Sequence, residues 1–446
     1  MQKSKKIIRP VKIIRGGVKL PHLKNTAEKE SVLLDNIEQV IIPIKQHIGT
    51  PCKPLVKKGD KVFVGTLIGD GKAADSTPIH SSVSGQVLRI KTITLSDGNK
   101  CRAVVINSDG QMTPDPELKG KEITSADELV KAARDCGLVG LGGAGFPTHI
   151  KLTVSDDKPI DTLIINGAEC EPYITTDYRE CIENCEDIFE GICTIKNLLG
   201  TQRVIIGLQK DKPKAIKALY DIVSHQSNIE NNIQLMKLPS KYTQGAEKVL
   251  IYSATGRKLP KDKLPSDVGC IVLNITTVSV LNRYIKTGMP LVFKRLTVDG
   301  NAVEKPGNYI VPIGTPINKV LEAAGAKDFE KIISGGPMMG QAISNTDLPV
   351  TKQNNAILAF KGIEAQTKPT TDCIRCGRCM KVCPMRLVPR KIETALELGA
   401  DGEKLSSLNA MHCIECGSCS FSCPAGHQLT ASMILAKETI RKAGDE

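Results

Sequence analysis

Two copies of one cysteine pattern near the end of this 446-residue chain limit its fold more than any other feature. Each copy reads C-x2-C-x2-C-x3-C-P, the spacing that binds [4Fe–4S] clusters in bacterial two-cluster ferredoxins. The cysteines are Cys373, Cys376, Cys379 and Cys383 before Pro384, then Cys413, Cys416, Cys419 and Cys423 before Pro424. Three thiolates two residues apart lie on one tight turn and can reach three irons of a cube. The pattern therefore predicts a carrier of single electrons.

The fourth cysteine of each run has a separate role. In two-cluster ferredoxins it ligates the other cluster. We therefore group Cys423 with the first three cysteines of the first run, and Cys383 with the first three of the second. Zinc also binds C-x2-C pairs, but zinc sites use two pairs rather than two quartets that end in Cys-Pro. Eight closely spaced thiols favour a metal in a reducing compartment over disulfides.

Length and composition give broader limits. A chain of this length is expected to form three or four domains, and 41% apolar residues are enough for sizeable cores. No stretch reaches the ~18–20 apolar residues of a membrane-spanning helix, and the basic N-terminus lacks the apolar core of a secretion signal. We expect an intracellular protein, soluble or docked on a membrane surface. The remaining cysteines are expected to be reduced thiols: Cys52, Cys101, Cys136, Cys170, Cys181, Cys185, Cys193 and Cys270.

The charge pattern is concentrated at the start of the chain. The formal net charge is +12, and only basic charged residues occur in the first fifteen positions: Lys3, Lys5, Lys6, Arg9, Lys12 and Arg15. Aromatic residues make up 3% of the chain and tryptophan is absent, so platforms for stacking nucleic-acid bases are not expected. We interpret the arm as a solvated or docking tail. A basic surface would also attract acidic partners.

The patterns predict an α+β chain of four parts. Residues 1–112 form a basic arm and a barrel-sandwich-like β module, which resembles biotinyl and lipoyl carrier half-barrels, with Lys72 unmodified. Residues 113–288 have α/β texture, with helices over 126–136, 178–199 and 214–224 and strands over 162–166 and 203–208. Residues 289–362 return to β segments. Residues 363–446 hold the cysteine runs, with one helical segment between them and a final helix over 431–442.

A glycine-rich loop follows the first of these helices. Gly140 to Gly145 matches G-x-G-x-x-G, but the dinucleotide fingerprint must follow a strand and open a helix. Here the preceding segment is helical and Pro147 follows at once, so we reject an ordinary Rossmann site. The glycines indicate either a tight turn or a backbone that approaches a flat or phosphorylated group.

Three segments resemble, in the same order, the NADH-oxidising subunit of respiratory complex I. They are residues 140–151 (GLGGAGFPTHIK), 166–172 (NGAECEP) and 242–248 (YTQGAEK), followed by Asn274. Nearly the whole chain resembles the RnfC family, which belongs to the Rnf complexes, the ion-translocating ferredoxin:NAD oxidoreductases. This resemblance implies an FMN- and NADH-binding domain at 113–288, a β-grasp-like SLBB domain at 289–362 and a two-[4Fe–4S] domain at the end.

The resemblance also implies roles for single residues. Backbone amides of the glycine loop would line FMN, at Gly140, Gly142, Gly143 and Gly145. Asn166 and Glu169 would contact the flavin, and Asn274 would hold its phosphate end. Phe146 would stack near the nicotinamide, and Lys151 would neutralise flavin or nucleotide charge. The segment around Gly245 would complete the site, with Glu171, Tyr242 and Glu247 facing the nicotinamide nucleotide.

Four positions depart from complex I. This chain has Leu141 in place of an arginine, Ala168 in place of an aspartate, Cys170 in place of a serine and Ala246 in place of a glutamate. The changes remove polar contacts and leave the glycine scaffold intact. They fit the Rnf-like branch better than complex I itself.

The implied function is that of a peripheral electron-transfer subunit in an oxidoreductase complex, at the cytoplasmic face of the cell membrane. NADH gives up two electrons, each cube accepts one, and a flavin connects the two modes. No side-chain acid or base is expected in the hydride step. Expected partners are membrane subunits and a ferredoxin-like iron–sulfur subunit, with no nucleic acid. Two alternatives remain: a cobalamin reductase with the same cofactors, or a flavin-free iron–sulfur scaffold, which Leu141 and Ala168 would suit.

Overall fold

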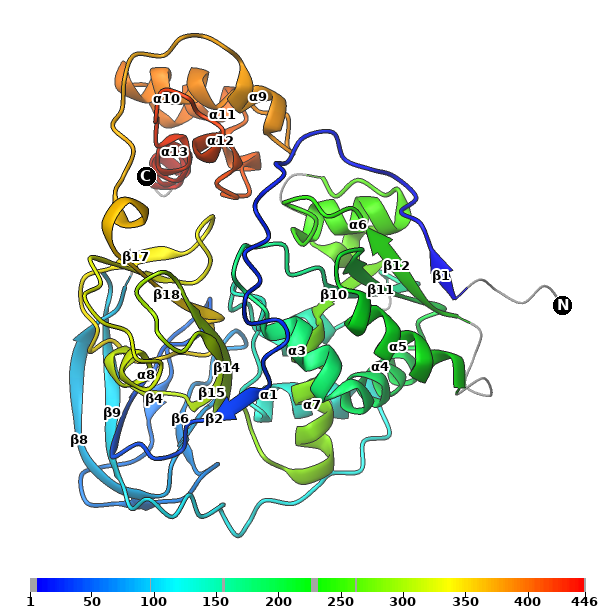
Figure 1. Cartoon of the computed structure of the whole chain (residues 1–446). Coiled ribbons are helices and arrows are strands. Elements are labelled where there is room, and N and C mark those ends of the chain that lie inside the picture. Colours follow the sequence, from blue (N-terminus) through cyan, green and yellow to red (C-terminus); the bar gives the residue numbers. More distant parts are fainter. Residues whose placement is uncertain (1–5, 97, 155–156, 226–231, 261–262, 445–446) are drawn as a thin grey trace, which may run out of the picture.

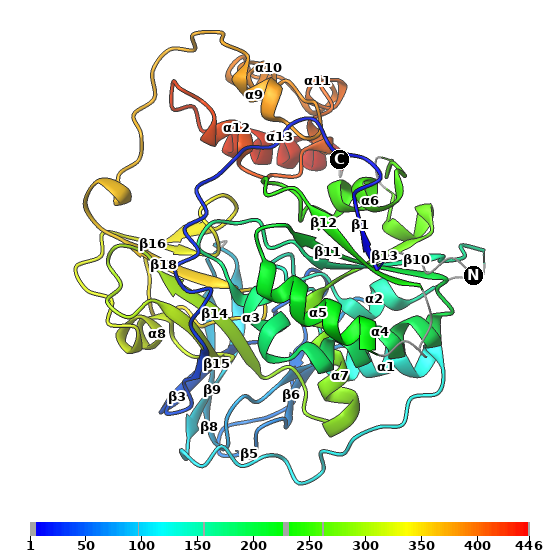
Figure 2. The same ribbon diagram turned by 45° about the vertical axis from the view of Figure 1, so that its right-hand side comes forward.

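The computed structural model describes residues 6–96, 98–154, 157–225, 232–260 and 263–444, and it divides into four packed parts (Figures 1 and 2). An α/β domain lies beside a β-rich half of the molecule, which contains the barrel module and a second sheet. A helical domain with both cysteine runs lies across one end of the molecule. Within the described residues, no helix has the length and apolarity needed to cross a membrane.

The α/β domain contains a five-stranded parallel sheet. Its strand order is β1 (Ile7–Ile8), β12 (Ile233–Leu238), β11 (Arg203–Gln209), β10 (Thr162–Gly167) and β13 (Cys270–Asn274). Alternate residues of β10 enter different cores: Leu163 and Ile165 join one cluster, and Ile164 joins another. Helices cover both faces of the sheet, so its strands are almost entirely apolar. They are α1 (Ala126–Asp135), α4 (Cys185–Leu199), α5 (Pro213–His225) and α7 (Ile275–Thr287) on one face, and α6 (Glu247–Thr255) on the other.

The helix expected over 178–199 is in fact two helices. The first is α3 (Thr176–Glu183), and α4 begins at Cys185. Asn184 between them has φ −132° and ψ 39°, outside the helical region. Asparagine tolerates such a break because its side chain competes with the helix for backbone hydrogen bonds. The predicted strands at 162–166 and 203–208 are confirmed as β10 and β11.

The second sheet forms the β-grasp-like domain. Its order is β17 (Gln341–Ile343), β16 (Lys331–Ser334), β18 (Ala356–Phe360), β14 (Phe293–Asp299), β15 (Gly307–Pro312) and β2 (Ser31–Leu33). Helix α8 (Ile317–Ala323) packs against it through Val320 and Leu321. A short 3-10 turn, η2 (Gly362–Ala365), follows β18.

The barrel module consists of two small antiparallel sheets around a shared core. One sheet is β3 (Gln39–Pro43), β9 (Lys100–Ser108), β8 (Gly85–Thr94) and β5 (Lys61–Val62), and the other is β4 (Lys53–Pro54), β6 (Leu67–Asp70) and β7 (Ile79–His80). Ile42, Ile68 and Val104 are fully buried in this core. Lys72 is exposed in the turn after β6.

The N-terminal arm is bound along the molecule, so the expected solvated or docking tail is wrong for its described part (Figure 1). Strand β1 pairs in parallel with β12, and β2 pairs in parallel with β15. Between them Gly17 N donates to Val382 O at 2.7 Å, and Val18 forms a bridge with Tyr242. Lys3 and Lys5 lie outside the described residues. The divisions at residues 112, 288 and 362 stay predictions, and both arm strands pair outside the barrel module.

The C-terminal domain is an internal repeat with an offset of forty residues. In the first copy α9 (Arg378–Val382) precedes α10 (Pro389–Glu397), and in the second α12 (Ser418–Phe421) precedes α13 (Leu429–Gly444). Left-handed backbone recurs at equivalent positions, at Arg375 and Glu415 and again at Gly377 and Gly417. The connection holds α11 (Gly402–Ser407) and the short turn η3 (Ala410–His412) besides α10, so the single helical segment expected there is wrong.

Candidate functional site

The glycine loop lies at the carboxyl edge of the parallel sheet, where ligands bind in open α/β folds. Asn166 and Asn274 are register partners at the ends of β10 and β13. Asn166 Nδ2 donates to Gly245 O at 2.8 Å. Asn274 caps α7 by accepting from Thr277 N at 3.2 Å. A Cβ added to Gly142 would lie 3.5 Å from Asn274 Nδ2, so three predicted segments meet here.

The tip of this loop presents open backbone amides. Gly142, Gly143 and Ala144 are exposed, and their amides donate no hydrogen bond within the described part of the chain. The loop is held from below, because Leu141 N donates to Thr277 Oγ1 at 3.0 Å. Gly143 has φ +111°, which favours glycine. Successive free amides beside a helix N-terminus suit the oxygen atoms of a phosphate or a flavin ring, so this loop fits FMN.

A pair of opposite charges stands next to the loop. Short helix α2 (Thr148–Leu152) carries Lys151, whose Nζ lies 2.9 Å from Glu247 Oε2 at the start of α6. The same Nζ donates to Val272 O at 3.3 Å and lies 5.9 Å from the centre of the Phe146 ring. The structure thus brings together three residues that the resemblance implied. Glu247 already neutralises Lys151.

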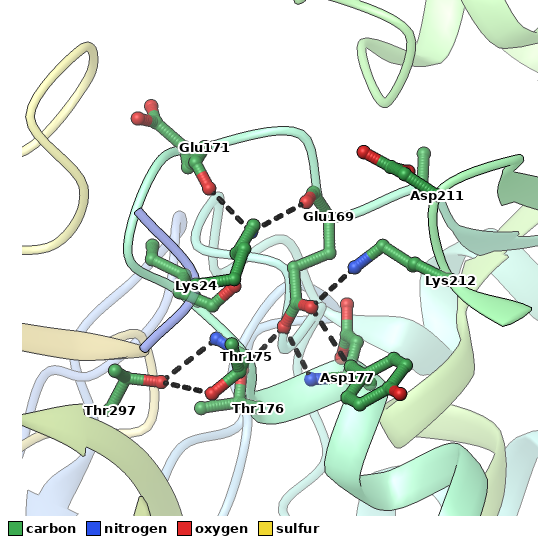
Figure 3. Close-up of polar contacts among 12 residues, drawn as sticks. Lys24, Glu169, Glu171, Thr175, Thr176, Asp177, Asp211, Lys212 and Thr297 are labelled. Carbon is green, nitrogen blue, oxygen red and sulfur yellow. Dashed lines mark hydrogen bonds and ion pairs between the residues drawn. The ribbon is translucent and has the colours of Figure 1, made fainter. Parts of the chain in front are cut away.

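Glu169 has a different position. Its buried carboxylate accepts from Asp177 N at 2.6 Å and Tyr178 N at 3.3 Å, and it pairs with Lys212 Nζ at 2.7 Å (Figure 3). It therefore satisfies the free amides at the start of α3. A contact between Glu169 and the flavin stays a prediction, and the carboxylate already has these protein partners.

Glu171 and Tyr242 lie at the boundary with the C-terminal domain. Tyr242 Oη donates to Glu171 Oε1 at 3.4 Å, and Met338 N donates to Glu171 Oε2 at 3.1 Å. Burial raises the pKa of Glu171 to about 7. Tyr242 is 3% exposed and packs in an apolar cluster with Val18 and Cys416. Their contact with a nicotinamide nucleotide stays a prediction.

Lys24 is a residue of this site that the sequence did not indicate. Its Nζ donates to the carbonyl oxygens of Glu169 at 3.2 Å and Glu171 at 2.7 Å, and also to that of Ile174 (Figure 3). Burial lowers the pKa of Lys24 to about 8, because an apolar environment disfavours the ammonium. Lys24 thus fastens the acidic loop at residues 169–174. Its partners are 145 to 150 positions away, so local pattern carries no signal of it.

A second missed group lies beneath the glycine loop. Asp177 accepts from Asn274 Nδ2 at 2.8 Å and from Thr276 Oγ1 at 2.7 Å, and burial raises its pKa to about 6. Lys294 of β14 donates to Leu141 O at 3.2 Å, and burial lowers its pKa to about 8. A lone lysine in the apolar run at 291–298 was a visible signal for Lys294. The second sheet therefore supports the loop.

The cysteine runs line two separate cavities. The outer cysteine set, Cys373, Cys376, Cys379 and Cys423, lines a cavity of about 650 Å³. The inner cysteine set, Cys383, Cys413, Cys416 and Cys419, lines a smaller one. These are the two groups of the crossed assignment. Cluster ligation by each cysteine stays a prediction.

The cysteine chemistry suits clusters better than single ions. Among the described residues, no three His, Cys, Asp or Glu side chains converge as ligands of one metal ion do. A cube spreads its four thiolates over four irons, which matches four cysteines around a cavity. Burial raises the pKa of Cys413 to about 12 and that of Cys419 to about 11, so the inner thiolates need a bound metal to hold their charge.

Four family models match the chain in order. They are the RnfC barrel sandwich hybrid domain at 12–111, the Nuo51 FMN-binding domain at 133–283, the SLBB domain at 295–342 and the 4Fe-4S dicluster domain at 367–424. The RnfC subunit of the Na(+)-translocating ferredoxin:NAD(+) oxidoreductase complex from Acetobacterium woodii is 40% identical over 96% of both chains. The chain belongs to the RnfC family.

Other RnfC relatives support this membership. The RnfC subunit of a proton-translocating ferredoxin:NAD(+) oxidoreductase complex from Clostridium ljungdahlii is 40% identical over 85% of this chain and 83% of its own. The RnfC subunit of an ion-translocating oxidoreductase complex from Rhodobacter capsulatus is 34% identical over 86% and 75%. The expected fold, FMN-binding domain and dicluster domain are thus confirmed. These findings do not favour the cobalamin reductase or flavin-free alternatives.

A solved structure shares the fold of this RnfC-family chain. It is a crystal structure of an NAD+-reducing [NiFe]-hydrogenase in the air-oxidized state, with a TM-score of 0.50 and 21% identity. The match covers 64% of this chain and 54% of that chain. At this identity it supports the fold alone.

Proposed function

We propose that this chain is the peripheral electron-transfer subunit of a membrane-bound, ion-translocating ferredoxin:NAD+ oxidoreductase complex. It would pass electrons between NAD(H), FMN and two [4Fe–4S] clusters, to or from partner subunits. The observation that carries the proposal is the grouping of eight cysteines around two cavities, in one chain with an FMN-binding domain. The printed names of the relatives supply the reaction and the kind of complex.

The residues have separable tasks in this proposal. The open amides of Gly142, Gly143 and Ala144 would hold FMN, with Asn166 and Asn274 beside them. When bound, FMN would supply the exchange between a hydride pair and single electrons. Lys151 and Glu247 would position charge at the nucleotide side of the loop. The inner and outer cysteine sets would carry the clusters.

The setting is also part of the proposal. The partners would be other subunits of the complex, including membrane subunits and a ferredoxin-like iron–sulfur subunit. The chain would lie at the cytoplasmic face of the membrane, where a soluble nucleotide can reach it. Ion movement would belong to the membrane subunits.

Anaerobic purification with cofactor analysis tests the central claim. We expect about eight irons and eight sulfides per chain, since two cubes hold four of each, and one FMN. Titration with NADH should then bleach the cluster absorbance. A colourless protein, or clusters that stay oxidised when NADH and FMN are both present, would refute the proposal.

One substitution tests the flavin loop separately. Gly143→Val places a side chain where φ is +111° and the loop is open, so FMN should be lost while iron content is unchanged. Gly110→Val is the matched control, because Gly110 also has a left-handed φ (+72°) and open space, but lies in the turn after β9. Equal FMN content in both variants would count against the assigned loop.

A second substitution tests the nucleotide side. Glu247→Gln removes the charge that neutralises Lys151 at 2.9 Å. We expect slower cluster reduction by NADH and unchanged reduction by dithionite, which needs no nucleotide site. An equal effect on both reductants would contradict the role of Glu247.

A further inference from the structure

The positive charge of the C-terminal domain is concentrated in one segment. Residues 363–446 contain eleven lysines and arginines against ten aspartates and glutamates, so the domain is nearly neutral. Residues 373–392 nevertheless contain six of those cations and no carboxylate. They are Arg375, Arg378, Lys381, Arg386, Arg390 and Lys391. The equivalent segment of the repeat, 413–432, has Glu415 and no lysine or arginine.

Most of these cations are free to act at a distance. Arg390 pairs with Glu393 and Glu397 at 2.6 and 2.8 Å. The other five are exposed, and none forms an ion pair with a carboxylate in the described part of the chain. Arg375, Lys391 and Lys404 line the cavity of the outer cysteine set. The cations therefore surround the place where Cys376 is exposed.

Apolar side chains occupy the middle of the same face. Ile374 is 68% exposed, Met380 47%, Val388 43% and Leu398 82%, and all four line the outer cavity. An apolar centre with a charged rim is the arrangement of protein interfaces, and methionine and arginine are enriched there. The inner set offers no such face, because Cys416 and Cys419 are 8% and 9% exposed.

We propose that this basic face, Arg375 to Lys391 with Lys404, is the docking surface for a small acidic iron–sulfur protein that exchanges one electron with the outer cluster. This inference rests on the proposed function and names the partner of its outer cluster site. One electron crosses the interface, so one centre is oxidised as the other is reduced. Cationic rims attract acidic partners at long range and weakly, as a transient redox encounter needs.

A phospholipid surface is the other anionic candidate, and the geometry favours the protein. The apolar side chains line a concave cavity together with the cysteines, whereas membrane anchors project outwards. A bilayer laid over this face would also cover the electron exit, and lipids accept no electron. A rounded acidic protein with its own cluster can enter the concavity and bring the two centres close.

The test uses the intact holoprotein and a purified small acidic two-[4Fe–4S] ferredoxin as the probe. In the variant Arg378→Gln/Lys381→Gln/Lys391→Gln, three exposed cations are removed and no cysteine is touched. The matched control, Lys57→Gln/Lys58→Gln/Lys61→Gln, removes three exposed cations from the barrel module, far from α9 in Figure 1. Iron and sulfide content should be unchanged in both.

Binding of oxidised ferredoxin is measured first, since it needs neither NADH nor flavin. At about 20 mM ionic strength the Debye length is on the order of 20 Å, so the cations act over the whole face. We expect the docking variant to bind about tenfold more weakly and the control within about twofold of the parent. At about 300 mM salt the parent and the variant should converge.

Stopped-flow transfer from dithionite-reduced ferredoxin to the holoprotein gives the second measurement. The second-order rate of the docking variant should fall by about tenfold at low salt. Equal binding and equal rates in both variants would overturn the docking surface. So would loss of binding to vesicles with about 30% phosphatidylglycerol while transfer stays unchanged, since the face would then contact membrane. Failure of NADH to reduce the parent's clusters would instead count against the proposed function.

Discussion

The first cysteine run lies at the surface with cations around it, whereas the second lies against the α/β domain with almost no charge. Both runs have the same spacing and the same left-handed positions. Cys376 is exposed, and its equivalent Cys416 is buried beside Val18 and Tyr242. One ligand pattern thus serves two surroundings. The comparison teaches that spacing prescribes how a cluster is held, and packing prescribes what it can exchange electrons with.

The inner surroundings are built by three other parts of the chain. A Cβ on Gly16 would lie 2.8 Å from Cys383 O, so the arm passes directly over that cysteine. Met338, in the turn between β16 and β17, touches Gly417, since a Cβ there would lie 2.4 Å from Met338 O. Glu171 accepts from Met338 N and Tyr242 Oη. The inner cysteine set therefore faces the flavin-binding domain, and the outer set faces away.

Removing one ligand from each set has the largest expected effect. Cys379→Ala and Cys419→Ala should each lower iron from about eight to about four per chain. The losses should differ in kind. Without the outer cluster, NADH should still reduce the inner one, whereas without the inner cluster the outer one should respond to dithionite and hardly to NADH. Metal analysis and electron paramagnetic resonance check this, and unchanged iron would refute the ligand assignment.

Equivalent glycines of the two runs give the next contrast. Gly377 has φ +68° with open space, and Gly417 has φ +74° with the Met338 carbonyl in the way. Gly377→Ala should cost about 1 kcal/mol for the left-handed backbone. Gly417→Ala should cost about 3 kcal/mol, because overpacking adds to that. Denaturant-induced loss of cluster absorbance measures both. Equal midpoints would mean that the inner run is not packed as described.

The inner contact should also depend on pH. Glu171 has a folded-state pKa of about 7 against 4.5 for the free carboxyl, so the folded state binds the proton more strongly. Stability is therefore lost as pH rises from 4.5 to 7, by up to about 3 kcal/mol. Glu171→Gln should be more stable than the parent at about pH 8 and no more stable at about pH 4.5. Parallel stability curves over this range would contradict the buried position.

Apolar side chains of the two surroundings give the smallest contrast. Ile374→Ala should change the unfolding free energy by less than about 0.5 kcal/mol, because the side chain is 68% exposed. Val18→Ala should cost about 1–2 kcal/mol, because Val18 is 6% exposed beside Cys416. Thermal unfolding of the two variants side by side checks the order, and a larger cost at Ile374 would reverse the comparison.

Some parts of the fold and site followed from local pattern. Strands β10 and β11 and helix α1 were predictable, because their apolar periods are determined by neighbours in the chain. The glycine loop and the crossed cysteine groups were predictable for the same reason. The break at Asn184 and the extra helix α11 were not, because one residue or a short polar turn decides them.

What the sequence by itself determined is the chemistry: two sets of thiols at cluster spacing and a glycine loop that leaves its amides open. Only the tertiary structure decided which set is inner, that the arm lies over Cys383, and that Lys24 holds the acidic loop from 145 positions away. The physical reason is range. Spacing along the chain governs local backbone geometry, whereas burial, charge environment and pKa depend on segments that meet only when the whole chain packs.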